Sequence, residues 1–192
     1  MNENKVIFGL KKVHYSVITE DATGKITYGT PDKLPGAVEM KLEPKGEQSD
    51  FYADDSNYYT ESSNQGYEGT LNLAKLTEAF RTEVLGEVLD ETDKVISEVS
   101  NAKTKRIALM FEFDGDVKAI RHLLYNVTVS RPGFGSSTKS DKTEPTTTEL
   151  KFVASQHPET SKVKDSTTVG TPAAIYDAWY TKVYEKKATQ GA

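Results

Sequence analysis

The segment that indicates the fold most clearly reads RIALMFEFDGD, from Arg106 to Asp116, and a second apolar run ending at Val129 follows it. An Asp-Gly pair between apolar runs is a strong signal for a β-hairpin, because both residues suit a tight type I′ turn. We therefore predict two antiparallel strands joined at Asp114–Asp116. A calcium loop that used Glu112 as a ligand is disfavoured, since the spacing and the distal glutamate of such loops are missing.

Alternating apolar and polar residues predict further strands on both sides of this hairpin. We expect them at residues 12–20, 26–28, 38–43, 70–76 and 146–153, with weaker candidates at 88–91, 94–99 and 162–169. Pro31 and Pro35 make the intervening stretch a fixed extended connection, because proline cannot donate to a strand ladder. The pattern is that of a mainly β (α+β) chain.

Two helices complete the expected elements. Thr77 is a suitable N-cap for a short helix over residues 78–85, which Gly86 can end in the left-handed conformation. A C-terminal helix is expected over residues 171–187, where apolar side chains recur at every fourth position, at Ile175, Trp179 and Val183. Thr171 would cap this second helix, with Pro172 at its first position.

The 192 residues are 36% hydrophobic and suit one domain spanning 1–192. We expect neither a membrane span nor a secretory signal, because no long apolar run is present. The absence of cysteine excludes disulfides, and it favours synthesis in the cytosol. The net charge of −5 argues against a basic nucleic-acid binder.

Acidic charge is concentrated in one segment. Residues 31–68 hold nine carboxylates and three lysines, a net charge of −6 that leaves +1 for the rest of the chain. We interpret residues 44–69 within it as an assembly arm, because tyrosine combines a large apolar ring with a polar group suited to interfaces. The candidate contact residues are Phe51, Tyr52, Asp54, Asp55, Tyr58, Tyr59 and Tyr67.

The same aromatic and acidic residues allow an alternative, a carbohydrate-binding or glycan-cleaving module. A glycosidase needs two carboxylates that flank the sugar. Asp54 and Asp55 are adjacent, and neighbouring residues of an extended chain point to different sides. Cleavage by this pair is therefore the weaker interpretation.

Other polar stretches and the histidines add no catalytic group. Residues 131–145 are rich in Gly, Ser, Thr and Lys, and we expect a long mobile loop there. His14, His122 and His157 are scattered, and each is expected on a solvent-facing side of its segment. We predict no catalytic, cofactor or metal site, and therefore not an enzyme.

Ten short blocks resemble the major tail protein, the tail tube subunit, of long-tailed siphophages of Gram-positive bacteria. They appear in the family's order and cover nearly the whole chain, although the loop after Arg131 and the stretch after His157 depart from the family. The blocks are Gly9–Tyr15, Tyr28–Pro31, Leu34–Val38, Phe51–Asp55, Gly66–Leu71, Phe80–Glu87, Phe111–Asp116, Tyr125–Asn126, Ser130–Pro132 and Tyr176–Trp179.

The resemblance implies more than the residues alone give. It implies two packed antiparallel sheets, a tail-tube β-sandwich or barrel, with one short flanking helix. It implies hexameric rings stacked into a tube, with an arm that reaches the next ring, in a virion tail assembled in the host cytoplasm. Implied partners are further copies of the chain, a tape-measure protein, and tail terminator and distal tail proteins. DNA would pass through the lumen without specific binding, and no membrane would be involved.

Overall fold

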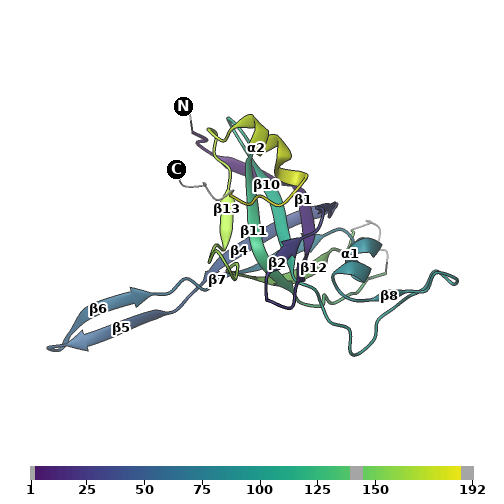
Figure 1. Ribbon diagram of the computed structural model, residues 1–192, viewed down its shortest axis with the longest axis horizontal. Helices are drawn as coiled ribbons and strands as arrows, with labels where there is room; N and C mark the ends of the chain where they lie inside the picture. Colours follow the sequence, from purple (N-terminus) through teal and green to yellow (C-terminus); the bar gives the residue numbers. More distant parts are fainter. Residues whose placement is uncertain (1–2, 139–144, 187–192) are drawn as a thin grey trace.

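The computed structural model describes residues 3–138 and 145–186, and an antiparallel sheet of nine strands dominates them (Figure 1). The strand order is β2-β1-β10-β11-β12-β7-β4, with β3 paired to β1 and β13 paired to β11. The bounds are β1 Ile7–Glu20, β2 Ile26–Tyr28, β3 Asp32–Lys33, β4 Ala37–Lys45, β7 Gly66–Leu73, β10 Ile107–Gly115, β11 Ile120–Val129, β12 Thr148–Ser155 and β13 Lys164–Ser166.

Two separate two-stranded ribbons lie outside this sheet. The first pairs β5, Gln48–Ala53, with β6, Ser56–Ser62; the second pairs β8, Val88–Leu89, with β9, Ile96–Ser97. The helices are short: α1 spans Glu78–Glu83, and α2, Ala173–Asp177, continues into the 3₁₀ turn η1, Ala178–Tyr180.

The predicted mainly β fold class with antiparallel sheets is confirmed. The strands that pack around the core belong to one hydrogen-bonded path, which curls so that β1 also contacts β4. In the described part of the chain this path does not close into a barrel. One edge of β4 is therefore left without a strand partner.

The hairpin of β10 and β11 is confirmed, but its turn was misplaced. Asp114 and Gly115 are still strand residues, paired with Phe8 and Ile7 of β1. The chain reverses over residues 116–119 instead. The pairing with β1 extends β10 past the Asp-Gly pair, so tertiary contacts override the local turn signal.

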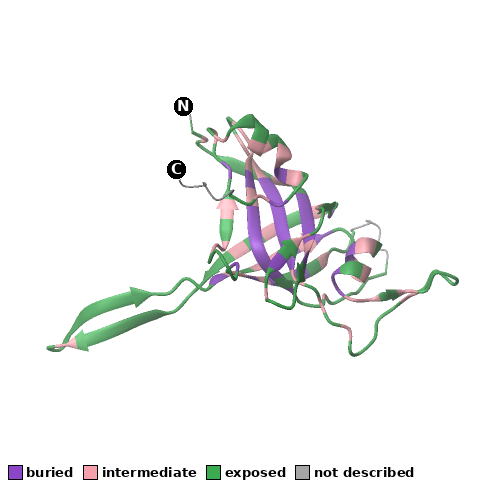
Figure 2. Cartoon of the chain, in the orientation of Figure 1, coloured by how far each residue is buried: buried purple, intermediate pink, exposed green. Residues whose placement is uncertain are grey.

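The main core lies between the curled sheet and α1. Thr77 caps α1 as predicted, accepting a hydrogen bond from the backbone N–H of Phe80 at 3.2 Å, and Gly86 follows the helix with φ +77°. The ring of Phe80 meets Tyr15 edge to face at 5.0 Å between centroids. Figure 2 shows the buried residues gathered in the strands of the main sheet. The large fully buried side chains include Tyr15, Leu34, Leu71, Leu73, Phe80, Ile107, Leu109, Phe111, Leu124 and Leu150.

The predicted C-terminal helix over 171–187 is wrong in length. Regular helix covers Ala173–Asp177, one 3₁₀ turn follows, and the described chain then runs to residue 186 without a further helix, Lys187 lying outside the described residues. The Tyr176 carbonyl oxygen accepts a hydrogen bond from the Arg121 guanidinium, which ties this segment to β11. The predicted cap is also wrong, because Pro172 occupies the N-cap position of α2 and not its first helical position, and the Thr171 hydroxyl accepts from the Thr168 N–H at 2.8 Å.

The apolar stripe predicted for that helix is nevertheless packed. Trp179 and Val183 cover the outer face of β10 and β11, against Ala108, Met110, Leu123 and Tyr125. The described parts of the predicted mobile loop, 131–138 and 145, have no regular secondary structure, and residues 139–144 lie outside the described part. The mobility of this loop stays a prediction.

Candidate assembly interface

The ribbon of β5 and β6 projects away from the main sheet (Figure 1). Among the described residues its two strands pair only with each other, from Gln48 opposite Ser62 to Ala53 opposite Ser56, with a register shift between Phe51 and Tyr52. Every residue of the two strands except Ala53 is exposed. We call residues 46–65 the arm. A lone two-stranded hairpin is marginally stable in water, so the arm gains stability from any surface that covers it.

The tip of the arm is a two-residue turn made by the paired acids. Asp54 has φ +50° and Asp55 φ +57°, between the paired residues Ala53 and Ser56. Two positive φ angles define a type I′ turn, whose twist matches that of the flanking strands, and aspartate tolerates this region better than most side chains. Both carboxylates therefore lie at the point farthest along the arm from the main sheet.

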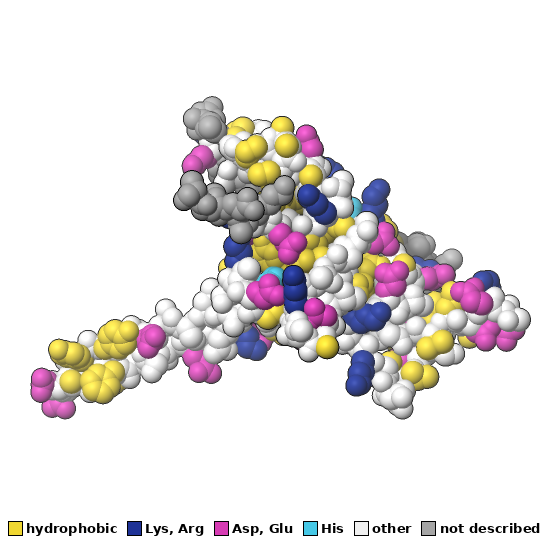
Figure 3. All heavy atoms as spheres, viewed as in Figure 1, with side chains coloured by type: hydrophobic (Ala, Val, Ile, Leu, Met, Phe, Trp, Pro, Cys, Tyr) yellow, Lys and Arg dark blue, Asp and Glu magenta, His cyan; other side chains and the backbone are white. Residues whose placement is uncertain are grey.

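Four aromatic side chains beside this tip are exposed to solvent. Phe51 is 60% exposed, Tyr52 66%, Tyr58 73% and Tyr59 58%. Figure 3 shows hydrophobic side chains gathered on the far end of the ribbon, next to acidic side chains. Phe51 and Tyr59 form a cross-strand pair. Contiguous exposed apolar surface rimmed by polar groups is typical of interaction sites, since leaving it in water is unfavourable.

Polar side chains of the ribbon bond to one another across the two strands. Asp50 faces Thr60 across the strands, and its carboxylate accepts hydrogen bonds from the Thr60 hydroxyl at 2.7 Å and the Gln48 amide at 3.2 Å. The hydrogen bond from the Thr60 hydroxyl lowers the pKa of Asp50 the most, and the hydrogen bond from the Gln48 amide lowers it further. The arm carries five carboxylates and no Lys, Arg or His. It is thus an anionic ribbon with an aromatic end.

Two glycines join the arm to the main sheet. The ladder between β4 and β7 continues into the arm, because Gln65 N–H donates to the Lys45 carbonyl at 2.8 Å. A Cβ on Gly46 would lie 2.0 Å from the Ser63 carbonyl oxygen. Gly66 has φ +103°, and a Cβ there would lie 2.0 Å from the Ala154 carbonyl oxygen. Only glycine fits such a close approach of backbones, so this junction has a defined geometry.

The structure narrows the arm predicted at 44–69. Residues 44–45 belong to β4, and residues 66–69 belong to β7. Tyr67 is therefore a half-buried residue of the main sheet, packed against the core and hydrogen-bonded by the Lys164 ammonium at 3.3 Å, and not part of the projecting ribbon. The other six candidates lie together at the end of the arm, and their contact with another subunit stays a prediction.

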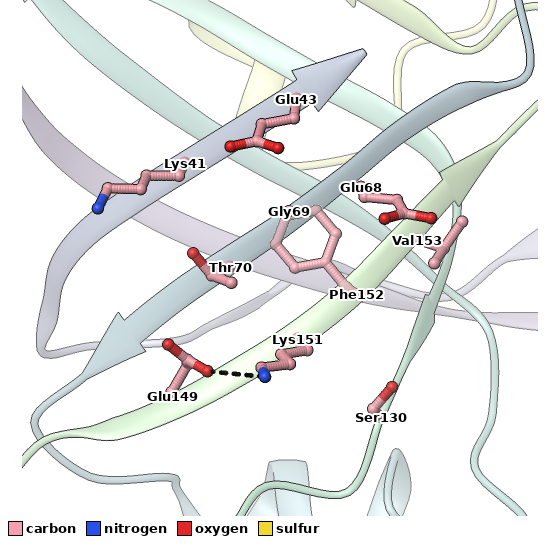
Figure 4. Close-up of a pocket in the computed structure, with 10 residues that line it drawn as sticks. All are labelled: Lys41, Glu43, Glu68, Gly69, Thr70, Ser130, Glu149, Lys151, Phe152 and Val153. Atoms are coloured by element: carbon pink, nitrogen blue, oxygen red, sulfur yellow. Dashed lines mark ion pairs between the residues drawn. The ribbon is translucent and has the colours of Figure 1, made fainter. Parts of the chain in front are cut away.

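A second exposed surface is the outer face of β4, β7 and β12, which contains a hollow of about 500 Å³. Figure 4 shows its charged side chains on neighbouring strands, with acids and lysines interspersed. Neighbouring opposite charges pair along this face: Lys45 with Glu68 at 2.7 Å, Lys41 with Glu39 at 3.3 Å and Lys151 with Glu149 at 3.4 Å between nitrogen and oxygen. The face is therefore hydrated, and with Glu43 included its acids outnumber its lysines by four to three.

The histidines were wrongly predicted to face solvent. His14 is 8% exposed and stacks on Tyr180 at 4.5 Å between centroids, and His157 is 5% exposed. The ring of His122 stacks on Phe111, and burial lowers its pKa to about 4. These rings fill space in packed aromatic clusters, because the neutral form of imidazole tolerates burial.

Glu112, the acid considered as a calcium ligand, is an ion-pair partner instead. Its buried carboxylate accepts from the Arg121 guanidinium and the Lys12 ammonium, each at 3.1 Å. Within residues 3–138 and 145–186, no cluster of three metal-ligating side chains occurs. No helix in those ranges is long and apolar enough to cross a membrane.

Comparison with known proteins places the chain in a family. The family model described as phage tail tube protein matches residues 1–192. Comparison with curated proteins finds no match. Because the family model spans the whole sequence, the chain belongs to the phage tail tube protein family.

Proposed function

We propose that this chain forms hexameric rings that stack into the phage tail tube and thereby provide a conduit for DNA ejection. The observation that carries the proposal is the arm, which leaves four aromatic rings in water on a ribbon paired with nothing else in the described chain. A head-to-tail contact between the arm and a different surface of the next copy joins copies into a ring when the rotation between them closes, and into an open filament when it does not.

The main sheet supports ring closure. The outer edge of β4 has no strand partner among the described residues, and unpaired edges readily pair with another chain. The outer face of β4, β7 and β12, which has a slight excess of acid, suits the lumen, because a lining without a basic surplus does not hold DNA. The tape-measure protein, tail terminator and distal tail proteins are the partners that this role requires, with assembly in the host cytoplasm.

The role is structural and needs no catalysis. The alternative, a glycan-binding or glycan-cleaving module, fits the arm poorly, since Asp54 and Asp55 are consecutive turn residues on an open ribbon. Calorimetry with soluble glycans tests it directly. Binding that is lost in Tyr58→Ala or Tyr59→Ala would support the alternative over the tube.

Electron microscopy of the purified protein tests the tube. We expect rings or hollow tubes at high concentration, or on addition of a tail initiator complex. A variant in which residues 46–65 are replaced by Asn-Gly should keep the fold, because the arm contributes no residue to the main core, but it should not form tubes. Tubes of normal length from this variant would refute the role of the arm, and a wild-type protein that stays monomeric in every condition would refute the proposed function.

A further inference from the structure

An aromatic, anionic arm requires a binding surface that is apolar and positively charged, and the described residues contain one. A groove of about 670 Å³ lies between α1, the stretch before β8 and the segment after β11. Its floor includes Leu76 and Leu85, which are 7% and 4% exposed, and at its rim Phe134 is fully exposed. A cavity of this size accepts one or two aromatic side chains.

Cations surround this apolar floor. Lys75, Arg81 and Arg131 line the groove, together with two carboxylates. Arg81 pairs with Glu87 at 2.6 Å, and Arg131 pairs with Glu98. A guanidinium has five N–H donors, so each arginine can bind a second carboxylate while keeping its first partner. The groove therefore offers the positive charge that the arm lacks.

A chain cannot place its own arm in its own groove. The arm lies at one end of the long axis of the molecule, whereas α1 and β8 lie toward the other end (Figure 1). The occupant that fits is thus the arm of a second copy, and repetition of this head-to-tail contact links successive copies into a larger assembly.

We propose that the aromatic end of the arm docks in this groove of the neighbouring copy. The rings of Phe51 and Tyr59 would cover Leu76, Leu85 and Phe134. The turn carboxylates of Asp54 and Asp55 would meet the cations at the groove rim. This inference rests on the proposed tube function and specifies the surface that receives the arm.

Charge exchange between the two surfaces tests the contact. Asp54→Lys with Asp55→Lys should raise the protein concentration needed for tube formation by about tenfold, which corresponds to the loss of a few surface ion pairs. Lys75→Glu with Arg131→Glu should have the same effect, and the combination of both changes should restore assembly. Lys25→Glu, at an exposed turn residue far in sequence from both surfaces, is the matched control.

Cross-linking provides a second measurement, since the natural chain has no cysteine. Under assembly conditions, Tyr59→Cys with Phe134→Cys should give a ladder of disulfide-linked multimers, whereas Tyr59→Cys with Lys25→Cys should not. If Lys75→Glu with Arg131→Glu fails to fold, as judged by circular dichroism, Lys75→Glu alone and the cross-link decide the question.

The outcomes separate this inference from the tube function. Groove variants that assemble like the wild type, together with no preferential cross-link, would overturn the docking site while tubes still form. A wild-type protein that forms neither rings nor tubes would refute the proposed function, and the docking site with it.

Discussion

Replacing Gly66 by alanine tests the junction between arm and sheet. The φ angle of +103° lies in a region that residues with a Cβ avoid, at a cost of about 1–3 kcal/mol. The new Cβ would also lie 2.0 Å from the Ala154 carbonyl oxygen. The backbone must shift to relieve this overlap, which weakens the pairing of β7 with β12 at about 1 kcal/mol per hydrogen bond. We therefore expect a loss of about 3 kcal/mol in the free energy of unfolding.

Thermal unfolding followed by circular dichroism measures this loss. In a chain of this size, about 3 kcal/mol corresponds to a Tm decrease of about 6–12 °C. Gly133→Ala is the matched control, because a Cβ there meets no atom within 4 Å. A decrease of less than about 2 °C for Gly66→Ala would refute the reasoning that close backbone approach fixes this junction.

Three further predictions concern the core and the arm. Glu112→Gln leaves the buried Arg121 without its counter-charge and should lower the free energy of unfolding by about 3 kcal/mol; an unchanged urea midpoint would contradict this. Burial holds His122 neutral in the folded chain, with a pKa of about 4 against 6.5 unfolded, so the unfolded state binds more protons between these values and stability falls as pH decreases from 6.5 to 4. His122→Phe should reduce the difference in Tm between pH 7 and pH 5, and an unaltered difference would assign the effect to other groups. Phe51→Ser with Tyr59→Ser should abolish tube formation with little change in Tm, since both side chains are exposed; a large decrease in Tm would show that they pack within the monomer.

Sequence patterns located most strands of the main sheet through the side of each strand that faces the core, but they missed β3, which lies in the stretch expected to be a connection around Pro31 and Pro35. Leu71 and Leu73 of β7, for example, are both fully buried and alternate with polar neighbours. The strands of the arm escaped prediction, although the segment was interpreted as an arm. Its aromatic residues are adjacent in pairs, Phe51-Tyr52 and Tyr58-Tyr59, and the ribbon has no buried side to impose alternation. The Asp54-Asp55 turn also lacks the glycine that usually signals a type I′ hairpin.

The C-terminal segment shows why a helical spacing of apolar residues does not by itself fix the length of a helix. Residues Ile175, Trp179 and Val183 do share an apolar surface, but the packing partner is the outer face of a sheet. Arg121 reaches that segment through its stack on Tyr176, at 3.7 Å from guanidinium carbon to ring centroid. Contacts of this kind join residues that are 55 positions apart, and no local pattern records them.

The continuity of the arm with β4 and β7 has a mechanical consequence. Tension on the end of the arm would run parallel to the two strands, through the ladder that pairs Lys45 with Gly66 and on into the main sheet. In this shear geometry many backbone hydrogen bonds share the load at once, whereas a pull perpendicular to the strands would open them one after another. A filament held together through such arms would resist stretching along the arms far better than peeling at their edges.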